Sequence, residues 1–277
     1  MKNTGERLLA DDFNRCALEH IHRYAFALEF VQNKIVIDIA SGEGYGSNLL
    51  ATKANYVTGI DISREAVEHS KNKYKKKNLS FLEGSTSEIP LDSQSVDVVV
   101  SFETIEHHDK HDEMMIEIKR VLKPDGMLII SSPDKNSFSK IPNFHNDFHI
   151  KELYLEEFKN LLSSYFSCHV FFSQKICYSS LIVSDSKMEF YEFSGDFNEI
   201  NKQKELVIPY YNIAIASMKN ISGLFASSFN GDSVYESIMS DTIDGFKNSY
   251  SYKIGRILIK PFSVIKQLFA KSRKNKK

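Results

Sequence analysis

Apolar and polar positions along the chain alternate between two periods, one typical of helices and one typical of buried strands. Residues 12–31 place apolar side chains three or four positions apart, which predicts a helix. Residues 35–40 form a short β-branched run, as in a strand covered on both faces of a parallel sheet. The change of period then repeats, predicting strands at 56–61, 79–82, 96–101 and 127–131 and helices at 47–53, 63–76 and 109–122.

Five strand–helix units with short connections predict an α/β domain. Because right-handed crossovers leave few other arrangements, we expect a Rossmann-like, doubly wound, mostly parallel sheet. A helix at 150–162 and strand candidates at 168–172 and 211–217 would bring it to seven strands. The expected organisation is an N-terminal cap helix region at 1–33, a core at 34–218 with an insertion near 179–206, a linker at 219–250 and a basic amphipathic C-terminal helix at 251–277.

Composition changes this picture mainly through the distribution of charge. The 277 residues, 42% hydrophobic and 26% charged, can bury a core. The net charge is −1, but all 36 acidic residues and 26 of the 35 basic ones lie before residue 251, whereas 251–277 carries nine basic residues. An acidic body of net charge −10 with a basic tail indicates an anionic surface as a partner of the tail alone.

The apolar residues of the tail form a helical stripe with basic residues beside it. They are Ile254, Ile257, Leu258, Phe262, Ile265, Leu268 and Phe269. This pattern favours a helix lying in the interface of an anionic membrane, kinked at Pro261 and too charged to span. A C-terminal helix docked on the body or on a second subunit is the alternative, and one basic helix on an acidic body disfavours nucleic acid.

Cysteine usage and the ends of the chain exclude further classes. Three scattered cysteines, at 16, 168 and 177, are too few for a disulfide framework or a cysteine-based zinc site. The start lacks the apolar core of a signal peptide, and no run of about 18 apolar residues occurs. We therefore expect a cytoplasmic protein, held peripherally at the inner face of the membrane by its tail.

A glycine-rich turn follows the first expected strand. Gly42, Gly44 and Gly46 come directly after residues 35–40, and Asp61 ends the second strand 19 residues after Gly42. Glycines let the backbone approach a ligand, and a carboxylate at that place can accept both hydroxyls of a ribose. The order is G-x-G-x-G without a following Lys-Ser/Thr, which disfavours a dinucleotide and excludes a P-loop. The pattern therefore predicts a nucleoside ligand.

The chain at this point resembles the class I S-adenosylmethionine-dependent methyltransferases. Val36 to Gly46 is similar to their first motif, 59–63 to the ribose-binding motif and 122–128 to the turn and fifth strand. Gly84 is followed by Ser85 where many members have an acidic residue for the adenine, so a hydroxyl or a carbonyl would take that role. The resemblance implies S-adenosylmethionine as cofactor, bound by Tyr24, Asp38, Ala40, Gly42, Gly44, Asp61, Ile62, Ser85 and Phe102.

Histidines after the fourth and fifth strands are candidates for the chemistry of methyl transfer. Transfer to oxygen is an in-line displacement that needs an aligned acceptor and help in removing its proton. His107, first, and His108, second, follow the fourth strand at the carboxyl edge where ligands bind in such folds. His149 lies in a loop that closes over the acceptor in similar enzymes. The alternatives are a solvated, capped helix start for the first two and local packing for the third.

The same segment permits a metal-assisted reaction. Glu103, Glu106 and His107 have the E-x-x-E-H spacing seen in resembling O-methyltransferases of ubiquinone synthesis. Two carboxylates and an imidazole could hold a divalent cation that acidifies a bound hydroxyl. The residues favour a protein base over this metal-assisted reaction.

The whole chain, in particular 5–7, 19–27 and 102–108, resembles methyltransferases found with bacterial surface-polysaccharide synthesis. The resemblance implies O-methylation of a sugar hydroxyl or a terminal phosphate, on a glycan or on a nucleotide- or lipid-linked sugar. The rivals are a quinone-type or other small-molecule O-methyltransferase, a non-catalytic nucleoside-binding module and a nicotinamide-dependent dehydrogenase. The sequence does not indicate the oligomeric state.

Overall fold

A computed structural model of the chain describes residues 15–256 apart from 177–178, 185–189, 191, 196–199, 204–205 and 207–208. The chain divides into two compact units, Met1–Asn230 and Gly231–Lys277. The first unit holds the sheet, and the second contains the helix α6 (Asp232–Asn248). Each unit is described by itself below.

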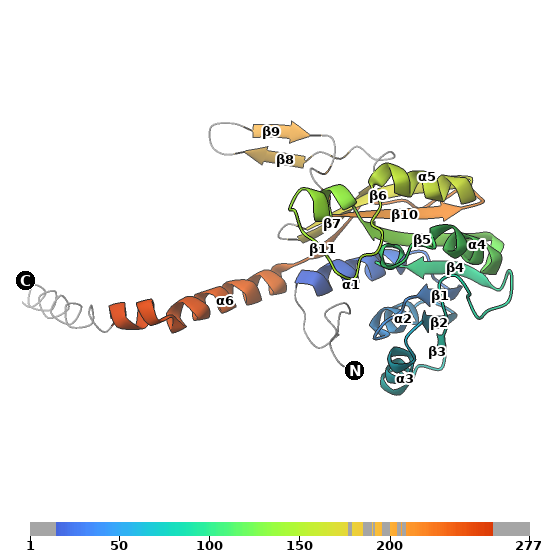
Figure 1. The fold of residues 1–277 in the computed structure, drawn as a ribbon, viewed down its shortest axis with the longest axis horizontal. Coiled ribbons are helices and arrows are strands. Elements are labelled where there is room, and N and C mark those ends of the chain that lie inside the picture. Colours follow the sequence, from blue (N-terminus) through green and yellow to red (C-terminus); the bar gives the residue numbers. More distant parts are fainter. Residues whose placement is uncertain are drawn as a thin grey trace, which may run out of the picture. The chain divides into compact units, whose positions relative to one another are not determined.

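A nine-stranded sheet forms the first unit, in the order β11-β7-β6-β10-β5-β4-β1-β2-β3 (Figure 1). Its parallel half joins β1 (Ile35–Ile39), β2 (Tyr56–Asp61), β3 (Leu79–Glu83), β4 (Val96–Ser101) and β5 (Leu122–Pro133). All of these strands end at one edge. The Rossmann-like doubly wound arrangement expected from the alternation of strands and helices is present in this half.

The other half of the sheet is antiparallel, and here the expected seven strands are wrong. It contains β6 (Cys168–Ile176), β7 (Ser179–Ser184), β10 (Tyr211–Ser217) and β11 (Ser227–Asn230). The additional strands β7 and β11 come from the segments expected to be an insertion and a linker. Both are short and serine-containing, so their apolar pattern is weak. The hairpin of β8 (Glu192–Gly195) and β9 (Ile200–Gln203) forms a separate two-stranded sheet.

Side chains alternate across the sheet and build an apolar core on each face. On one face, Ile37, Ile60 and Val99 pack with residues of α4 (His111–Val121) and α5 (Leu155–Tyr165). On the other face, strand residues pack with α1 (Arg15–Ala27) and α2 (Tyr45–Leu50). The helix α3 (Arg64–Lys73) contacts β2 and β3. Because each strand supplies both cores, the near-continuous apolar runs of the sequence are explained.

Two element boundaries differ from those the sequence predicts. The turn at 123–126 lies within β5 as an irregularity, because Val96 pairs with Leu122 whereas Val98 pairs with Met127. The helix expected from residue 150 begins at Leu155. The backbone N–H groups of Ile150 and Lys151 donate instead to the Glu106 carbonyl, at 2.8 and 3.0 Å. Residues 150–151 are thus bound to the loop after β4 rather than to a helix.

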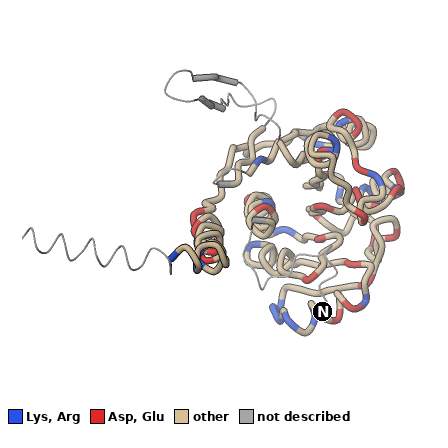
Figure 2. Tube along the Cα trace, turned by 60° about the vertical axis from the view of Figure 1, so that its left-hand side comes forward, with Lys and Arg blue, Asp and Glu red and all other residues tan. Residues whose placement is uncertain are grey.

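The basic C-terminal segment noted in the sequence belongs to the second unit. Acidic residues recur through the first unit and along α6, with basic residues between them (Figure 2). Residues 257–277, most of the expected basic helix, lie outside the described residues. None of the helices in the described part of the chain combines the length and the apolar character needed to span a membrane.

Buried polar contacts hold α1 against the antiparallel half of the sheet. Gln174 of β6 accepts from the Arg23 guanidinium at 2.8 Å and donates to the Glu19 carbonyl at 3.1 Å. His22 hydrogen-bonds Ser180 and Ser227, at 2.7 and 3.0 Å. Burial lowers the pKa of His22 to about 4, so the imidazole is neutral in these contacts. The second half of the chain therefore fixes the position of the first helix.

The Asp38 carboxyl joins α1 and α2 to the central strand. It is fully buried in β1 and accepts from Ser47 Oγ at 2.6 Å and from the Tyr24 hydroxyl at 3.1 Å. Burial raises the pKa of Asp38 to about 7, although both hydrogen bonds favour the ionised form. The folded protein therefore binds a proton here more tightly than the unfolded chain, whose Asp pKa is near 4.

This difference predicts a pH-dependent stability. Protonated Asp38 contributes its full stabilisation below about pH 4, and the contribution is lost as pH rises towards 7. Asp38→Asn cannot ionise and can still accept the two hydrogen bonds. We expect its free energy of unfolding, relative to wild type, to rise by roughly 2–4 kcal/mol between pH 5 and pH 8, measured by denaturant titration. Asp92→Asn, at an exposed carboxylate, is the control. A pH-independent difference for Asp38→Asn would contradict the assignment.

Candidate active site

A cavity of about 370 Å³ opens at the carboxyl edge of the parallel strands. The segments that follow β1, β2, β3 and β4 form its wall, together with side chains from α1. We call it the sheet-edge cavity. Of the residues expected at the donor or the acceptor, it is lined by Tyr24, Ala40, Gly42, Asp61, Ile62, Ser85, Phe102, His107 and His108.

The first glycine and the acidic residue of the motif meet directly in this wall. The backbone N–H of Gly42 donates to Asp61 Oδ2 at 2.8 Å, and that of Ser63 donates to Oδ1 at 2.8 Å. These two bonds fix the Asp61 carboxylate in the cavity wall, and each carboxylate oxygen can accept more than one hydrogen bond. Gly42 has a φ of +54°, and a Cβ there would meet no described heavy atom within 4 Å. The loop is therefore open on the side of the cavity.

The other two glycines serve the packing behind the loop. A Cβ at Gly44, which has a φ of +89°, would lie 2.8 Å from Ser70 Oγ, and one at Gly46 would lie 1.9 Å from the Tyr24 ring. Glu43, between Gly42 and Gly44, is buried and binds Lys73 and Tyr74 of the α3 region. The turn is thus built both for close packing and for access to a ligand.

Aromatic and apolar side chains form the remaining wall. The Tyr24 ring contacts Phe102 edge to face, with ring centroids 5.1 Å apart. The exposed Ile62 offers an apolar surface beside Asp61, suited to a flat ring. His20 Nδ1 lies within hydrogen-bond distance of the Tyr45 hydroxyl, at 3.0 Å. Burial lowers the pKa of His20 well below its ordinary value, so the imidazole is neutral. Ser85, at the position where many class I methyltransferases have an acidic residue, hydrogen-bonds Ser87.

Asp38 and Gly44 are not among the described residues that line the cavity. Both lie one layer behind it, Asp38 against Tyr24 and Gly44 at the N-terminus of α2. A role of theirs in binding a donor would act through Tyr24 and the loop. The assignments of individual residues to the donor stay predictions.

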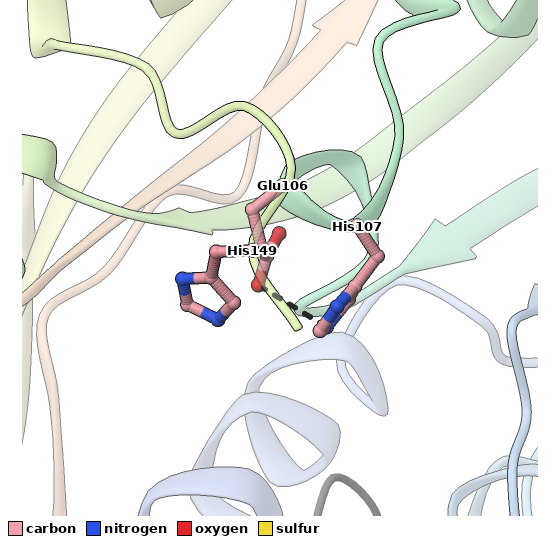
Figure 3. A group of neighbouring side chains, drawn as sticks. All are labelled: Glu106, His107 and His149. Carbon is pink, nitrogen blue, oxygen red and sulfur yellow. Dashed lines mark ion pairs between the residues drawn. The ribbon is translucent and has the colours of Figure 1, made fainter. Parts of the chain in front are cut away.

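A second cluster, formed by Glu106, His107 and His149, lies next to the cavity (Figure 3). Its three ligand-type atoms lie within 4.8 Å of one another, and the two imidazole rings are perpendicular, 5.2 Å apart. His107 comes from the turn η1 (Ile105–His107), and His149 comes from the segment before α5, after η2 (Asn136–Lys140). The structure thus brings together two histidines that are 42 residues apart in the sequence.

The Nδ1 atom of each imidazole faces a hydrogen-bond acceptor. His107 Nδ1 lies 3.0 Å from the Phe148 carbonyl, and His149 Nδ1 lies 2.5 Å from Glu152. These contacts favour the tautomers with a proton on Nδ1 and a lone pair on Nε2. Both imidazoles are therefore suited to accept a proton or to bind a cation through Nε2.

Glu103 is not part of this cluster, which therefore differs from the expected set of Glu103, Glu106 and His107. It accepts from Ser131 Oγ at 2.6 Å and lies 3.8 Å from the buried Arg23 guanidinium. Its φ of +49° is a strained conformation for a non-glycine residue. That backbone turn directs the Glu103 side chain to β5 and α1, and His149 takes its place beside Glu106.

His108 is oriented differently from His107. Its Nε2 lies 3.3 Å from Thr86 Oγ1, and burial together with the neighbouring His111 lowers its pKa. It remains a second candidate base on the other side of the cavity. Thr86, Lys110 and Glu43 were missed from the sequence. Only Glu43, within the glycine motif, had a signal there.

Comparisons with known proteins give a matching family for the part of the chain that supplies most of the cavity wall. A model of the methyltransferase domain family matches residues 37–130. A probable S-adenosylmethionine-dependent methyltransferase of Mycolicibacterium smegmatis is 36% identical over 130 residues, covering 47% of this chain and 50% of that protein. A fatty-acid O-methyltransferase of the same species is 26% identical over 123 residues, covering 43% of this chain and 44% of that protein. This chain thus spans about half the length of these relatives.

Solved structures show the same architecture. One of them, a Thermotoga maritima protein described as an S-adenosylmethionine-dependent methyltransferase, matches with a TM-score of 0.54 at 15% identity. The match covers 73% of this chain and 91% of that protein, which shows the α/β methyltransferase fold. Residues 37–130 therefore match the methyltransferase domain family, and the first relative that matches this part of the chain is named a probable S-adenosylmethionine-dependent methyltransferase.

Proposed function

We propose that this protein transfers a methyl group from S-adenosylmethionine to a sugar hydroxyl of a surface polysaccharide or of its lipid-linked precursor. The observation that carries the proposal is the position of the sheet-edge cavity between two sets of groups. Asp61 and Gly42 form one wall, and His107, beside His149, forms another. A nucleoside donor held by the first wall would present its methyl group towards the second.

The reaction needs only alignment and removal of one proton. The acceptor oxygen attacks the methyl carbon, the C–O bond forms as the C–S bond breaks, and S-adenosylhomocysteine leaves as a neutral thioether. The hydroxyl proton goes to a base, and His107 Nε2 is our first candidate because Nδ1 is held by the Phe148 carbonyl. Asp61 would accept the ribose hydroxyls, Ile62 and Phe102 would contact the apolar parts of the donor, and Ser85 would lie near the adenine.

The loop before α5 supports an acceptor that carries a lipid. Its side chains at Ile141, Phe144, Phe148 and Ile150 are 40–68% exposed, although they are apolar. Such residues next to a histidine pair fit a molecule with a polar reacting end and an apolar tail. A lipid-linked sugar has this character. The polysaccharide acceptor itself rests on the resemblance stated above.

A fatty-acid carboxyl is the second candidate acceptor. The M. smegmatis relative is named a fatty-acid O-methyltransferase, and the same exposed apolar loop would suit an acyl chain. A carboxylate is already ionised at neutral pH, so its methylation would not need a base. Dependence on His107 thus separates the two candidates.

Removing the Asp61 carboxylate tests the donor site. Asp61→Ala should raise the dissociation constant for S-adenosylmethionine by roughly 10- to 100-fold, measured by titration calorimetry, because charge-assisted hydrogen bonds are lost. Glu83→Ala removes an exposed carboxylate from the residue that lies opposite Asp61 in the register of β3 with β2, and it should leave affinity unchanged. Unchanged affinity of Asp61→Ala would refute the assignment of this cavity to the donor.

The acceptor is tested by incubation of the full chain with isotopically labelled donor. Separate reactions contain lipid-linked glycans, free polysaccharide fragments, a fatty acid or a quinol, and mass spectrometry detects the added methyl group. We expect transfer to a glycan, with the rate lowered roughly 10²- to 10⁴-fold in His107→Gln. His145→Gln, in the same loop as His149 but highly exposed, should retain the wild-type rate. Methylation of the fatty acid alone, or full turnover by His107→Gln, would contradict the proposal.

We also propose that 251–277 holds the enzyme at the anionic inner face of the cytoplasmic membrane, where lipid-linked sugars are assembled. Wild-type protein should sediment with phosphatidylglycerol vesicles at low salt and be released at high salt, because exposed charges are screened. A chain ending at residue 250 should not sediment but should methylate a soluble acceptor at the same rate. Sedimentation of the truncated chain, or a wild-type chain that ignores the vesicles, would contradict membrane docking.

A further inference from the structure

We propose that Glu106, His107 and His149 form a binding site for a divalent transition-metal ion beside the sheet-edge cavity. Each offers one ligand atom, and Glu106 Oε1 lies 4.0 Å from His107 Nε2 (Figure 3). The site differs from the set suggested by sequence spacing, because His149 replaces Glu103. What the ion would do for the acceptor rests on the proposed function, whereas the binding site itself does not.

The buried carboxylate is the first argument for a cation. Glu106 is 1% exposed, and its Oε2 atom has no hydrogen-bond partner among the residues that the structure describes. A buried, ionised carboxylate without a partner is costly unless a cation lies beside it.

The partners behind the ligands are the second argument. Metal-binding histidines usually donate their other N–H to a carbonyl or a carboxylate, which fixes the ring and raises its basicity. His107 has the Phe148 carbonyl at this place, and His149 has Glu152. Glu152 also accepts from Ser139 at 2.6 Å, and the Phe138 ring stacks on His149 with centroids 5.4 Å apart. Both Nε2 atoms are thus oriented before any ligand arrives.

The backbone joins the two segments that supply the ligands. The Glu106 carbonyl accepts from the N–H groups of Ile150 and Lys151, at 2.8 and 3.0 Å. These bonds hold the residue after His149 against the residue before His107. Metal–ligand bonds of about 2.1 Å would require the ligand atoms to approach to about 3 Å, a closure of roughly 1–2 Å.

The ligand set indicates which ions fit. Two imidazoles and one carboxylate suit Mn²⁺, Fe²⁺, Co²⁺ or Zn²⁺, whereas Ca²⁺ and Mg²⁺ prefer oxygen ligands. Three protein ligands leave coordination positions open. His107 also lines the cavity, so an acceptor hydroxyl could bind at an open position. Such an ion would lower the pKa of that hydroxyl. In the metal-bound enzyme His107 would be a ligand in place of the base proposed above, and the proton would pass to solvent as the methyl group is transferred.

Binding is tested on the untagged full chain after removal of metals by a chelator, with Co²⁺ as the probe. We expect one Co²⁺ per chain, detected by its visible absorption and by titration calorimetry. Glu106→Gln and His149→Ala should each raise the dissociation constant at least 10- to 100-fold. His145→Ala, at an 84% exposed side chain of the same loop, and Glu103→Gln should bind Co²⁺ like wild type. Each variant should still bind S-adenosylmethionine, which shows that it is folded.

Absence of stoichiometric Co²⁺ binding would overturn the proposal, as would binding that survives in both Glu106→Gln and His149→Ala. Loss of binding in Glu103→Gln with retention in His149→Ala would also overturn it. Co²⁺ binding without methylation of any acceptor would support the site and count against the proposed function. Full methyl transfer by the metal-free enzyme would instead refute the role of the ion in activating the acceptor.

Discussion

The glycine-loop side of the sheet-edge cavity depends on one buried carboxyl group. Asp38 sits at the centre of the sheet, and its two hydrogen bonds fix Tyr24 from α1 and Ser47 from α2. Tyr24 in turn lies so close to Gly46 that no larger residue fits there. The glycine loop is therefore shaped from behind, by packing against an aromatic ring, and the side facing the cavity is left open at Gly42. A group in the apolar core thus determines the form of a binding surface.

Backbone hydrogen bonds organise the other side of the cavity, which carries His107 and the adjoining Glu106 and His149. The Glu106 carbonyl binds residues 150 and 151, and the Phe148 carbonyl faces His107, so the loops after β4 and β5 form one structure. The side chains of Glu106, His107 and His149 are brought together as a consequence. Because these contacts use the main chain, a substitution within the loop could change what it binds without separating the histidines.

The parallel half of the sheet was predictable from sequence because its signals are local. A β-branched run, three glycines and Asp61 specify a strand, a turn and the end of the next strand, and the structure places Gly42 and Asp61 in direct contact. His149 was expected in a loop near the acceptor, and that role stays a prediction. Its position beside His107 was not predictable, because 42 residues separate the two in the sequence. The direction of Glu103 was not, because it follows from a positive φ and from contacts with Ser131 and Arg23 across the fold. Strands β7 and β11 were missed because their short, serine-containing segments carry little apolar pattern.

The region beyond the matched residues supports one side of the sheet-edge cavity from behind and lies beside the other. The family model ends at residue 130, yet β6, β7 and β11 hold α1 through Gln174, Ser180 and Ser227. Since α1 supplies His20 and Tyr24 to the cavity wall, the antiparallel half of the sheet fixes the position of these two side chains through α1. The segment before α5 supplies His149 and the exposed apolar side chains. Under the proposed function, a domain similar to that of relatives with different named activities would keep its donor site, while residues after 130 would change the groups that face the acceptor. Acceptor specificity is therefore expected to reside in that later part of the chain.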